Sequence, residues 1–348
     1  MRLGIVIGAG NKPSSWENYQ KACSHLKIDS VLVDMKSANW LNHYIEVCKS
    51  IDGLLVGPPC VNPEEYSIYM ERLYFIQNEF GTPMYPSYNE LKLYENKRYC
   101  SHWLELHKFP HPSTTVLCDK VEALKYLSKC VYPIVIKAPI GAGASAVHII
   151  RSQIHAKLIV HQIFGLHRLL SCGYVSWVKD EKTIIPIPLI GSSLKHNVVI
   201  QEFIPIKWEW RIIKIGDSYF GHQKLLRGAY ASGSDRVGWV APPIELLDMI
   251  RSVCERGQFL SMAMDVFEGL DGRFYINELQ SMFGSYNTAQ MRIDGIPGRY
   301  VYDRGDYRFE KGYFNLCGSR LLRVRHFVKI LTDKDIDLSS IEGVQYKE

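Results

Sequence analysis

The first 90 residues alternate short apolar segments with amphipathic ones, and this alternation limits the folds open to the chain more than any other feature. Each apolar segment has the length of a buried strand, and each amphipathic segment repeats its apolar residues at helical spacing. Strands are expected over residues 3–9, 30–33 and 53–56, and helices around residues 16–26, 41–48 and 66–76. Strands that alternate with helices form parallel sheets covered on both faces. The sequence therefore predicts an α/β domain here.

A second unit begins where this pattern breaks, at Pro86. Its periodicity is mixed, with several strands in succession and fewer helices between them. Helices are expected over residues 95–107, 155–170 and 244–259, and strands over 132–137, 147–150, 183–190, 198–203, 209–215, 218–223, 261–267 and 273–279. We find no internal repeat and no low-complexity segment in the chain.

The composition is that of an ordinary globular protein. Of the 348 residues, 47% are hydrophobic and 22% are charged, which excludes a disordered, collagen-like or coiled-coil chain. Nine cysteines occur singly, so reduced thiols are expected rather than disulfides or structural zinc. The net charge of +5 is too small to indicate a nucleic-acid partner. Without a segment long enough to span a bilayer or a secretion signal, we expect a cytoplasmic protein.

The dipeptide Asp271-Gly272 is the strongest hairpin signal in the chain. If these two residues form the turn, Asp265 and Glu278 lie directly opposite each other on neighbouring strands. Facing carboxylates repel, and their largely apolar neighbours leave little solvent to screen the charges. Such a pair is stable when a proton or a cation lies between the two groups.

An amide completes this candidate site. Gln280 lies two residues beyond Glu278 and therefore on the same face of the strand. Two carboxylates and an amide oxygen are hard ligands that suit Mg²⁺, with phosphate oxygens completing its octahedron. The sequence therefore predicts a metal site of Asp265, Glu278 and Gln280. The alternative is a solvated rim on which both acids point into water.

Two lysines are candidates for phosphate binding. Lys137 ends the apolar strand 132–137 and precedes a loop of small residues, 138–146. Backbone N–H groups of such a loop can approach phosphate oxygens, and the lysine adds a positive charge. Lys97, on the helix 95–107, is the second candidate. The alternatives are a strand-end lysine that reaches solvent and a solvated helix face.

Further polar residues gather between residues 201 and 224. Residues 201–205, Gln-Glu-Phe-Ile-Pro, end a strand before a proline, and such a segment can offer backbone groups to an adenine ring. Glu209, Arg211 and Lys224 follow on the next two strands. Arg211 alternates with apolar residues, so its side chain can line a cleft. Each basic residue taken alone also fits a solvated surface, and only their convergence with the two carboxylates favours a site.

Taken in order, these motifs resemble those of the ATP-grasp superfamily. The matching run is Lys97, Tyr-Pro-Ile-Val-Ile-Lys137 with its loop, Gln-Glu202-Phe-Ile204, Glu209-Trp-Arg211, Met-Asp265-Val-Phe and Ile-Asn-Glu278-Leu-Gln280-Ser. The resemblance covers residues 86–290. Within the superfamily, the chain most resembles the carboxylate–amine ligases, such as ribosomal-protein glutamate ligases, glutathione synthetase and D-alanine–D-alanine ligase.

The resemblance implies an α/β fold in which the N-terminal parallel domain, residues 1–90, precedes an ATP-grasp fold of two α+β subdomains. The first subdomain would cover residues 91–204, and the second, with the metal hairpin, residues 205–297. Residues 298–348 would form a C-terminal basic extension, since 298–329 hold eight Arg or Lys against three Asp or Glu. Aromatic residues beside these cations suit an anionic sugar or peptide. The alternative is a tail docked on the core with a solvated basic rim.

The resemblance also assigns one group of residues to ATP: Lys97, Lys137, Gly143, Ser145, Glu202, Ile204 and Glu209. The two lysines would hold the phosphates, and the loop with the glycine and the serine would close over them. The segment around Glu202 and Ile204 would present backbone groups to adenine, and Glu209 would bind the ribose hydroxyls.

A second group would act at the reacting atoms. By the same resemblance, Arg211 and Lys224 would stabilise the transferred phosphate or an acyl phosphate. The metal set of Asp265, Glu278 and Gln280 would hold one or two Mg²⁺ ions. The family usually has Asn where this chain has Gln280, whose amide oxygen lies one methylene group further from the backbone.

The resulting hypothesis is an ATP- and Mg²⁺-dependent carboxylate–amine ligase. A substrate carboxylate, from an amino acid, a peptide or a uronic-acid sugar, would attack ATP to give an acyl phosphate, and an amine would then displace phosphate. The alternatives are a phosphotransferase and a nucleotide-binding module without turnover. The family's Arg-Ser-Asn element is absent over residues 231–236, which leaves the acceptor open. A homodimer is one option for the assembly.

Overall fold

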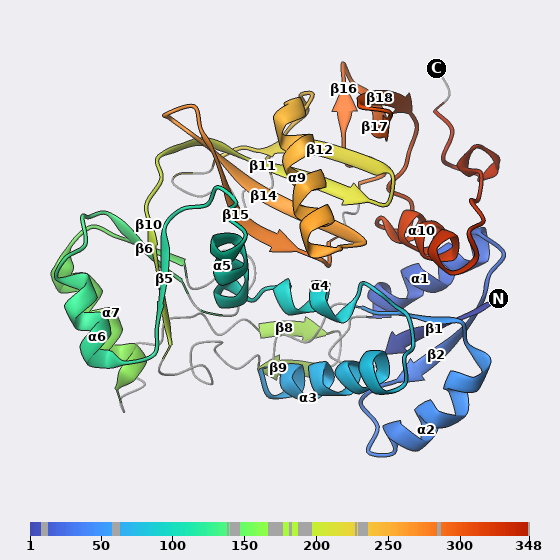
Figure 1. Cartoon of the computed structure of the whole chain (residues 1–348), viewed down its shortest axis with the longest axis horizontal. Helices are drawn as coiled ribbons and strands as arrows, with labels where there is room; N and C mark the ends of the chain where they lie inside the picture. The colour runs from blue at the N-terminus through green and yellow to red at the C-terminus, as the bar shows by residue number, and fades with distance from the viewer. Residues whose placement is uncertain are drawn as a thin grey trace.

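The computed structural model describes residues 1–7, 13–57, 63–137, 139, 147–165, 177–180, 183–186, 197–226, 228, 236–283 and 287–346. These residues form three sheets and a separate two-stranded sheet, with helices packed against them (Figure 1). The N-terminal sheet and the last helix lie side by side at one end of the molecule. A small sheet lies at the other end, and the largest sheet lies between them.

The N-terminal sheet is parallel, as the sequence predicts. Its order is β2-β1-β3-β4, with β1 (Arg2–Ile7), β2 (Asp29–Asp34), β3 (Gly53–Leu55) and β4 (Met84–Tyr85). The helices are α1 (Pro13–His25), α2 (Trp40–Val47) and α3 (Pro63–Tyr74), with a 3-10 turn at Cys48–Ser50 and a π-helical turn at Phe75–Glu79. Leu3 and Ile5 pack with α1, whereas Val6 packs with α2 and α3, so both faces are buried.

The small sheet is antiparallel and has the order β5-β10-β6-β7. Its strands are β5 (Thr114–Leu117), β6 (Ile134–Lys137), β7 (Val147–Ile150) and β10 (Val198–Glu202). Helices α6 (Lys120–Leu127) and α7 (Gln153–Phe164) pack against these strands and form a separate hydrophobic core with them. The hairpin of β8 (Trp177–Asp180) and β9 (Thr183–Pro186) forms the separate two-stranded sheet.

The largest sheet has eight strands, of which six follow the order β15-β14-β11-β12-β17-β16, while β13 pairs with β12 and β18 with β17. The strands are β11 (Ile206–Ile215), β12 (Ser218–Lys224), β13 (Val237–Gly238), β14 (Ser261–Gly269), β15 (Phe274–Gln280), β16 (Arg292–Ile293), β17 (Ile296–Asp303) and β18 (Asp306–Lys311). Helix α9 (Ile244–Gly257) packs on one face, where Trp210 and Ile212 point. Glu209 and Arg211 therefore point to the opposite face.

Two short helices after β4 also pack on the largest sheet. They are α4 (Tyr88–Leu93) and α5 (Lys97–Leu106), and Leu93, Cys100 and Leu104 share a core with α9. Glu90 of α4 is fully buried and accepts a hydrogen bond from the Ser261 N–H at 2.9 Å, which joins α4 to β14. The predicted first subdomain, residues 91–204, grouped α5 with the strands of the small sheet. By its packing, α5, which holds Lys97, belongs instead with the largest sheet.

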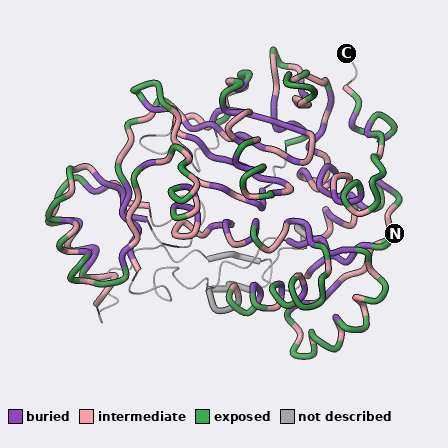
Figure 2. The backbone as a smooth tube through the Cα atoms, viewed as in Figure 1, coloured by how far each residue is buried: buried purple, intermediate pink, exposed green. Residues whose placement is uncertain are grey.

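The C-terminal segment is an integral part of the core rather than an extension. Strands β17 and β18 belong to the largest sheet, and α10 (Arg320–Thr332) packs against α1, followed by a 3-10 turn at Leu338–Ser340. Figure 2 shows buried residues along β12 and β14 of the largest sheet, and α10 buries residues 321–324, 327 and 328, whereas the outer sides of α2, α6 and α7 are exposed. Among the described helices, none combines the length and the apolar character needed to cross a membrane.

Arg323 belongs to the basic segment 298–329, which the sequence suggested could bind an anionic sugar or peptide, but it is not available to such a partner. Its side chain is fully buried. The guanidinium donates to the Ser281 carbonyl oxygen at 2.9 Å and lies 4.2 Å from the centre of the Phe283 ring. A charge in this position serves the packing of α10 against the sheet, which favours the alternative of a docked tail.

Candidate functional site

The hairpin of β14 and β15 places Asp265 directly opposite Glu278, and this prediction is confirmed. The path to that register differs from the expected one. The hairpin loop has three residues, 270–272, instead of two, and Gly272 adopts a left-handed φ of +78°. A bulge at Asn277 then adds one residue to β15 and restores the pairing. The two differences cancel, so the carboxylates still face each other.

Asp265 is an ion-paired anion with both oxygens engaged. The side chain is only 1% exposed. Arg211 binds it in bidentate fashion, with Nε 2.8 Å from Oδ1 and Nη2 2.8 Å from Oδ2. The Nζ atom of Lys224 lies 2.6 Å from the same Oδ2. Burial alone would raise the pKa of Asp265, but Arg211 and Lys224 hold it well below its usual value.

Glu209 extends this network along the sheet. It lies opposite Lys224 in the register of β11 and β12, and its Oε1 is 2.6 Å from the Lys224 Nζ. Arg211 lies opposite Asp265 in the register of β11 and β14. Burial raises the pKa of Glu209 although Lys224 pulls it down. The structure thus brings four predicted residues together on one face of one sheet.

Asn277 connects the largest sheet to the small one. Its Oδ1 accepts a hydrogen bond from Lys137 Nζ at 2.9 Å, and its Nδ2 donates to Glu209 Oε2 at 3.1 Å. Lys137 is the last residue of β6 and is only 8% exposed. Burial, with the charge of Lys97 nearby, lowers the pKa of Lys137 to about 8. Sequence reasoning missed Asn277, because its orientation depends on the bulge.

A second group of charges lies where α5 approaches β15. The Nζ atom of Lys97 is 3.6 Å from Glu278 Oε1 and 3.8 Å from Glu95 Oε2. Gln280 Nε2 donates to Glu95 Oε1 at 3.4 Å. Burial and the charge of Glu278 raise the pKa of Glu95 to about 8. Sequence reasoning missed Glu95, and the only signal for it was an acid two residues before Lys97.

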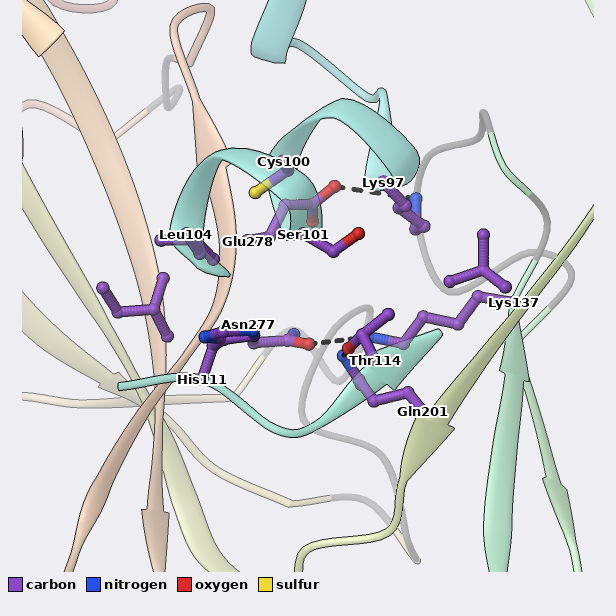
Figure 3. A pocket seen from close by; sticks show the side chains of 12 residues that line it. Lys97, Cys100, Ser101, Leu104, His111, Thr114, Lys137, Gln201, Asn277 and Glu278 are labelled. Atoms are coloured by element: carbon purple, nitrogen blue, oxygen red, sulfur yellow. Dashed lines mark hydrogen bonds and ion pairs between the residues drawn. The ribbon is translucent and has the colours of Figure 1, made fainter. Parts of the chain in front are cut away.

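A narrow pocket lies between Lys97 and Glu278 of the second group and the Lys137–Asn277 contact, and Figure 3 shows its lining. Lys97 projects from α5, Lys137 from β6, and Asn277 and Glu278 from β15. Gln201 of β10, which directly precedes Glu202, completes the side toward the small sheet. With a volume of about 20 Å³, the pocket has room for water but not for a nucleotide.

Comparison with solved structures finds several proteins of the same architecture. A D-cycloserine synthetase, DcsG, aligns over 95% of this chain and 100% of its own, with a TM-score of 0.62 and 13% identity. A RimK domain ATP-grasp protein from Sphaerobacter thermophilus DSM 20745 aligns over 80% and 90%, with a TM-score of 0.52 and 16% identity. The D-alanine–D-alanine ligase of Bacillus anthracis aligns over 81% and 87%, with a TM-score of 0.52 and 15% identity.

The chain has the ATP-grasp fold. No protein-family model matches its sequence, and no curated protein matches it. At 13 to 16% identity, the likeness to solved structures establishes the architecture alone. The roles of individual residues are therefore inferred from the contacts and distances within this chain, and not from its structural neighbours.

The remaining ATP-binding roles stay predictions. Glu202 ends β10, and its N–H donates to the Ser113 carbonyl oxygen at 2.9 Å, so this N–H is not among the backbone groups that the segment could offer to adenine. Ile204 follows in the segment between β10 and β11 and is half-buried. The predicted loop residues Gly143 and Ser145 lie outside the described residues.

The chemistry of the donor set fits a hard divalent cation, although no three His, Cys, Asp or Glu side chains of the described segments lie together as metal ligands. Glu278 Oε1 is buried without a hydrogen-bond partner. Gln280 adds an amide oxygen on the same strand, two residues beyond. The remaining positions of an octahedral Mg²⁺ ion would be filled by phosphate oxygens and water. Two protein side chains are enough for such an ion, so the fit holds.

Proposed function

We propose that this protein is an ATP- and Mg²⁺-dependent carboxylate–amine ligase. The observation that supports it most is the convergence of four cations, from α5, β6, β11 and β12, around the facing carboxylates of Asp265 and Glu278. This arrangement suits a reaction in which negative charge develops on phosphoryl oxygens. Two neighbours of the same fold are named as a D-cycloserine synthetase and a D-alanine–D-alanine ligase, which is consistent with the proposal.

ATP would bind between the small sheet and the largest sheet. Lys97 and Lys137 would hold its phosphates, because both line the pocket there and both are anchored on regular elements. The adenine ring would contact backbone groups near Ile204, and Glu209 would accept hydrogen bonds from the ribose. For Glu209 this contact exchanges the present hydrogen bond with Asn277 for one with a ribose hydroxyl.

The reaction proposed has two steps. A carboxylate oxygen of the first substrate attacks the γ-phosphorus, the bond to the ADP oxygen breaks, and an acyl phosphate forms. The amine then attacks the acyl carbon, phosphate leaves, and the amine loses a proton to solvent. Arg211 and Lys224 would stabilise the acyl phosphate, since Asp265 holds both cations on the face of the sheet that bears the site. Bound Mg²⁺ would neutralise charge on the phosphoryl oxygens.

The substrates proposed are a small carboxylate and an amine, drawn from amino acids, peptides or uronic-acid sugars. Single cysteines without disulfide partners support a reducing, cytoplasmic location, and the seven in the described segments are free thiols. A homodimer and a second Mg²⁺ ion remain part of the proposal.

Trapping with hydroxylamine tests the ligase proposal. Incubation of the protein with ATP, Mg²⁺ and a panel of amino acids and uronic acids is expected to give little steady ADP release, because the acyl phosphate stays in the closed site. Addition of hydroxylamine as a surrogate amine is expected to release a hydroxamate together with ADP and phosphate. Mass spectrometry identifies the hydroxamate and therefore the acid.

The same samples distinguish the ligase from its main alternative. A phosphotransferase needs one acceptor and leaves a stable phosphorylated product. Detection of such a product, with no hydroxamate from any acid that supports ATP turnover, would overturn the ligase proposal. ATP binding without turnover under every acid and amine tested would favour the nucleotide-binding module.

Nucleotide binding is expected to take up a proton at alkaline pH because of Lys137. Its pKa of about 8 means that the amine is mostly uncharged at about pH 9 and mostly charged at about pH 6.5. A phosphate beside the amine favours the charged form and raises the pKa, so ATP binding adds a proton at the higher pH only. Calorimetry in two buffers of different ionisation enthalpy measures this uptake.

Two variants test whether Lys137 is the group that takes up the proton. Lys137→Met is expected to abolish the uptake and to weaken ATP binding more than ADP binding. Lys129→Met, an exposed lysine just before β6, is the matched control and is expected to behave as the wild type. Unchanged uptake in Lys137→Met would assign the proton to another group.

A further inference from the structure

Two buried carboxylate oxygens near the first residue of α5, Lys97, have no hydrogen-bond partner. They are Glu95 Oε2 and Glu278 Oε1. The Glu95 side chain is 9% exposed and that of Glu278 is 16% exposed, so water screens neither charge well. Gln280 joins the pair through its amide, which donates to the other oxygen of Glu95 at 3.4 Å. Buried carboxyl oxygens without partners are costly, and two of them so close together favour a cation site.

Asp265 is a poor candidate for the same ion. Both of its oxygens are already within 2.8 Å of the guanidinium of Arg211, and the ammonium of Lys224 adds a third contact at 2.6 Å. Coordination of a metal by Asp265 would displace a bidentate ion pair, which is among the stronger polar contacts in proteins. Coordination by Glu95 and Glu278 would displace no hydrogen bond from the two oxygens.

We propose that Glu95, with Glu278 and Gln280, holds the catalytic Mg²⁺ ion of this chain, and that Asp265 instead orients Arg211 and Lys224. This inference rests on the proposed function, because it assigns a metal ligand to the same site. It replaces one member of the metal set predicted from the sequence. Glu95 lies before α5, outside the hairpin that supplies the other two ligands.

The charges around Lys97 agree with this assignment. Its ammonium lies 3.6 Å from the free oxygen of Glu278 and 3.8 Å from that of Glu95, distances that are too long for hydrogen bonds. When both carboxyls are ionised, one ammonium compensates only one of the two negative charges. A divalent ion between the carboxylates compensates both, and it leaves the lysine to bind a phosphate oxygen.

The backbone fixes Glu95 in this position. Its φ of +52° lies in the left-handed region, which is uncommon for a residue with a side chain. The next residue, Asn96, caps α5 by accepting a hydrogen bond from the Tyr99 N–H at 3.2 Å. The Lys97 N–H donates to the Pro139 carbonyl oxygen at 2.9 Å, which ties the turn to the end of β6. These contacts hold a strained turn that points a carboxylate at Glu278.

Binding of Mn²⁺ to the full-length protein in the presence of ADP tests the proposal without any need for turnover. Titration followed by electron paramagnetic resonance measures the free and bound ion. Glu95→Gln is expected to raise the Mn²⁺ dissociation constant by about tenfold or more, because one of two carboxylate ligands is lost. Asp265→Asn is expected to stay within about threefold of the wild type. Glu105→Gln, an exposed acid on α5, is the matched control and is expected to show no change.

A second variant covers the case in which Glu95→Gln fails to fold, which circular dichroism shows. Glu95→Asp keeps the charge but withdraws the oxygens by one methylene group, and it is expected to weaken Mn²⁺ binding by a smaller factor. Wild-type affinity for Mn²⁺ in either folded Glu95 variant would overturn the assignment, and so would a large loss in Asp265→Asn alone. Weaker ADP binding with unchanged Mn²⁺ affinity would show that Glu95 only positions Lys97, and would also overturn it.

The same titration separates failure of this inference from failure of the proposed function. If the wild type binds ADP and Mn²⁺ but Glu95→Gln binds Mn²⁺ equally well, only the assignment of Glu95 is wrong. If the wild type binds neither ADP nor Mn²⁺, the proposed function itself is wrong, and the metal site fails with it.

Discussion

Replacing Glu278 with Gln is expected to abolish Mg²⁺-dependent ATP turnover while the fold is retained. Glu278 is the carboxylate common to the metal set predicted from the sequence and to the set inferred from the structure. Its Oε1 is buried without a hydrogen-bond partner, so removal of the charge breaks no hydrogen bond at this oxygen. Loss of the metal removes the main neutralisation of phosphoryl charge, so turnover should fall on the order of 1,000-fold or more. ADP release at saturating Mg²⁺ measures the effect.

The hairpin itself offers a matched control for this variant. Asp271 is an exposed acid in the loop between the same two strands, so Asp271→Asn makes the same chemical change away from the site. Turnover by Asp271→Asn is expected to equal that of the wild type. If Glu278→Gln turned over ATP at the wild-type rate and at ordinary Mg²⁺ concentrations, Glu278 would not be a metal ligand.

The facing carboxylates could be predicted from the sequence because side chains in strands alternate between faces. Once Asp271-Gly272 is recognised as a turn, the period of two places Asp265 and Glu278 on one face. The detailed path was wrong, since the loop is longer by one residue and Asn277 bulges from β15. Neither feature has a strong local signal, and the register survives only because each shifts it by one residue in opposite directions.

The sequence predicted which residues belong to the site around the carboxylates, but not which of them contact one another. Arg211 was expected to line a cleft, and in the structure it binds Asp265, which lies 54 positions away in the chain. A period of two assigns a face, but it says nothing of which strand lies alongside. Glu95 depends on a left-handed turn that tertiary contacts hold in place, so no propensity argument finds it.

For the C-terminal segment the prediction was wrong in another way, because basic residues were assumed to be exposed to solvent. Eight basic residues between 298 and 329 suggested a surface for an anionic partner. In the structure Arg299 pairs with Glu310 at 2.9 Å and stacks on Phe314 at 4.5 Å, and its side chain is 8% exposed. Arginine can be buried where its five donors find acceptors and its plane meets an aromatic ring. Composition alone therefore cannot separate a basic surface from a buried arginine network.

The structural role of this segment leads to the largest stability change that we expect. Phe327 of α10 is 1% exposed and packs in a core shared with β1, β3 and β4. Its ring lies 5.6 Å from that of Tyr85, centre to centre. A Cβ atom on Gly53 would lie 2.5 Å from Phe327 Cζ, so the absence of a side chain at residue 53 makes room for this ring. The ring therefore fills space that no neighbour can fill if it is removed.

Phe327→Ala is expected to lower the free energy of unfolding by about 3–5 kcal/mol, because it removes a buried aromatic ring and leaves a cavity. Urea unfolding followed by tryptophan fluorescence measures it, and the midpoint should fall by about 1 M or more. Ile330→Ala, on the same helix but 45% exposed, is the control and should change the stability by less than about 1 kcal/mol. If α10 completes the core, loss of a buried side chain must destabilise the protein more than loss of an exposed one. Equal urea midpoints for the two variants would therefore mean that α10 is a dispensable extension.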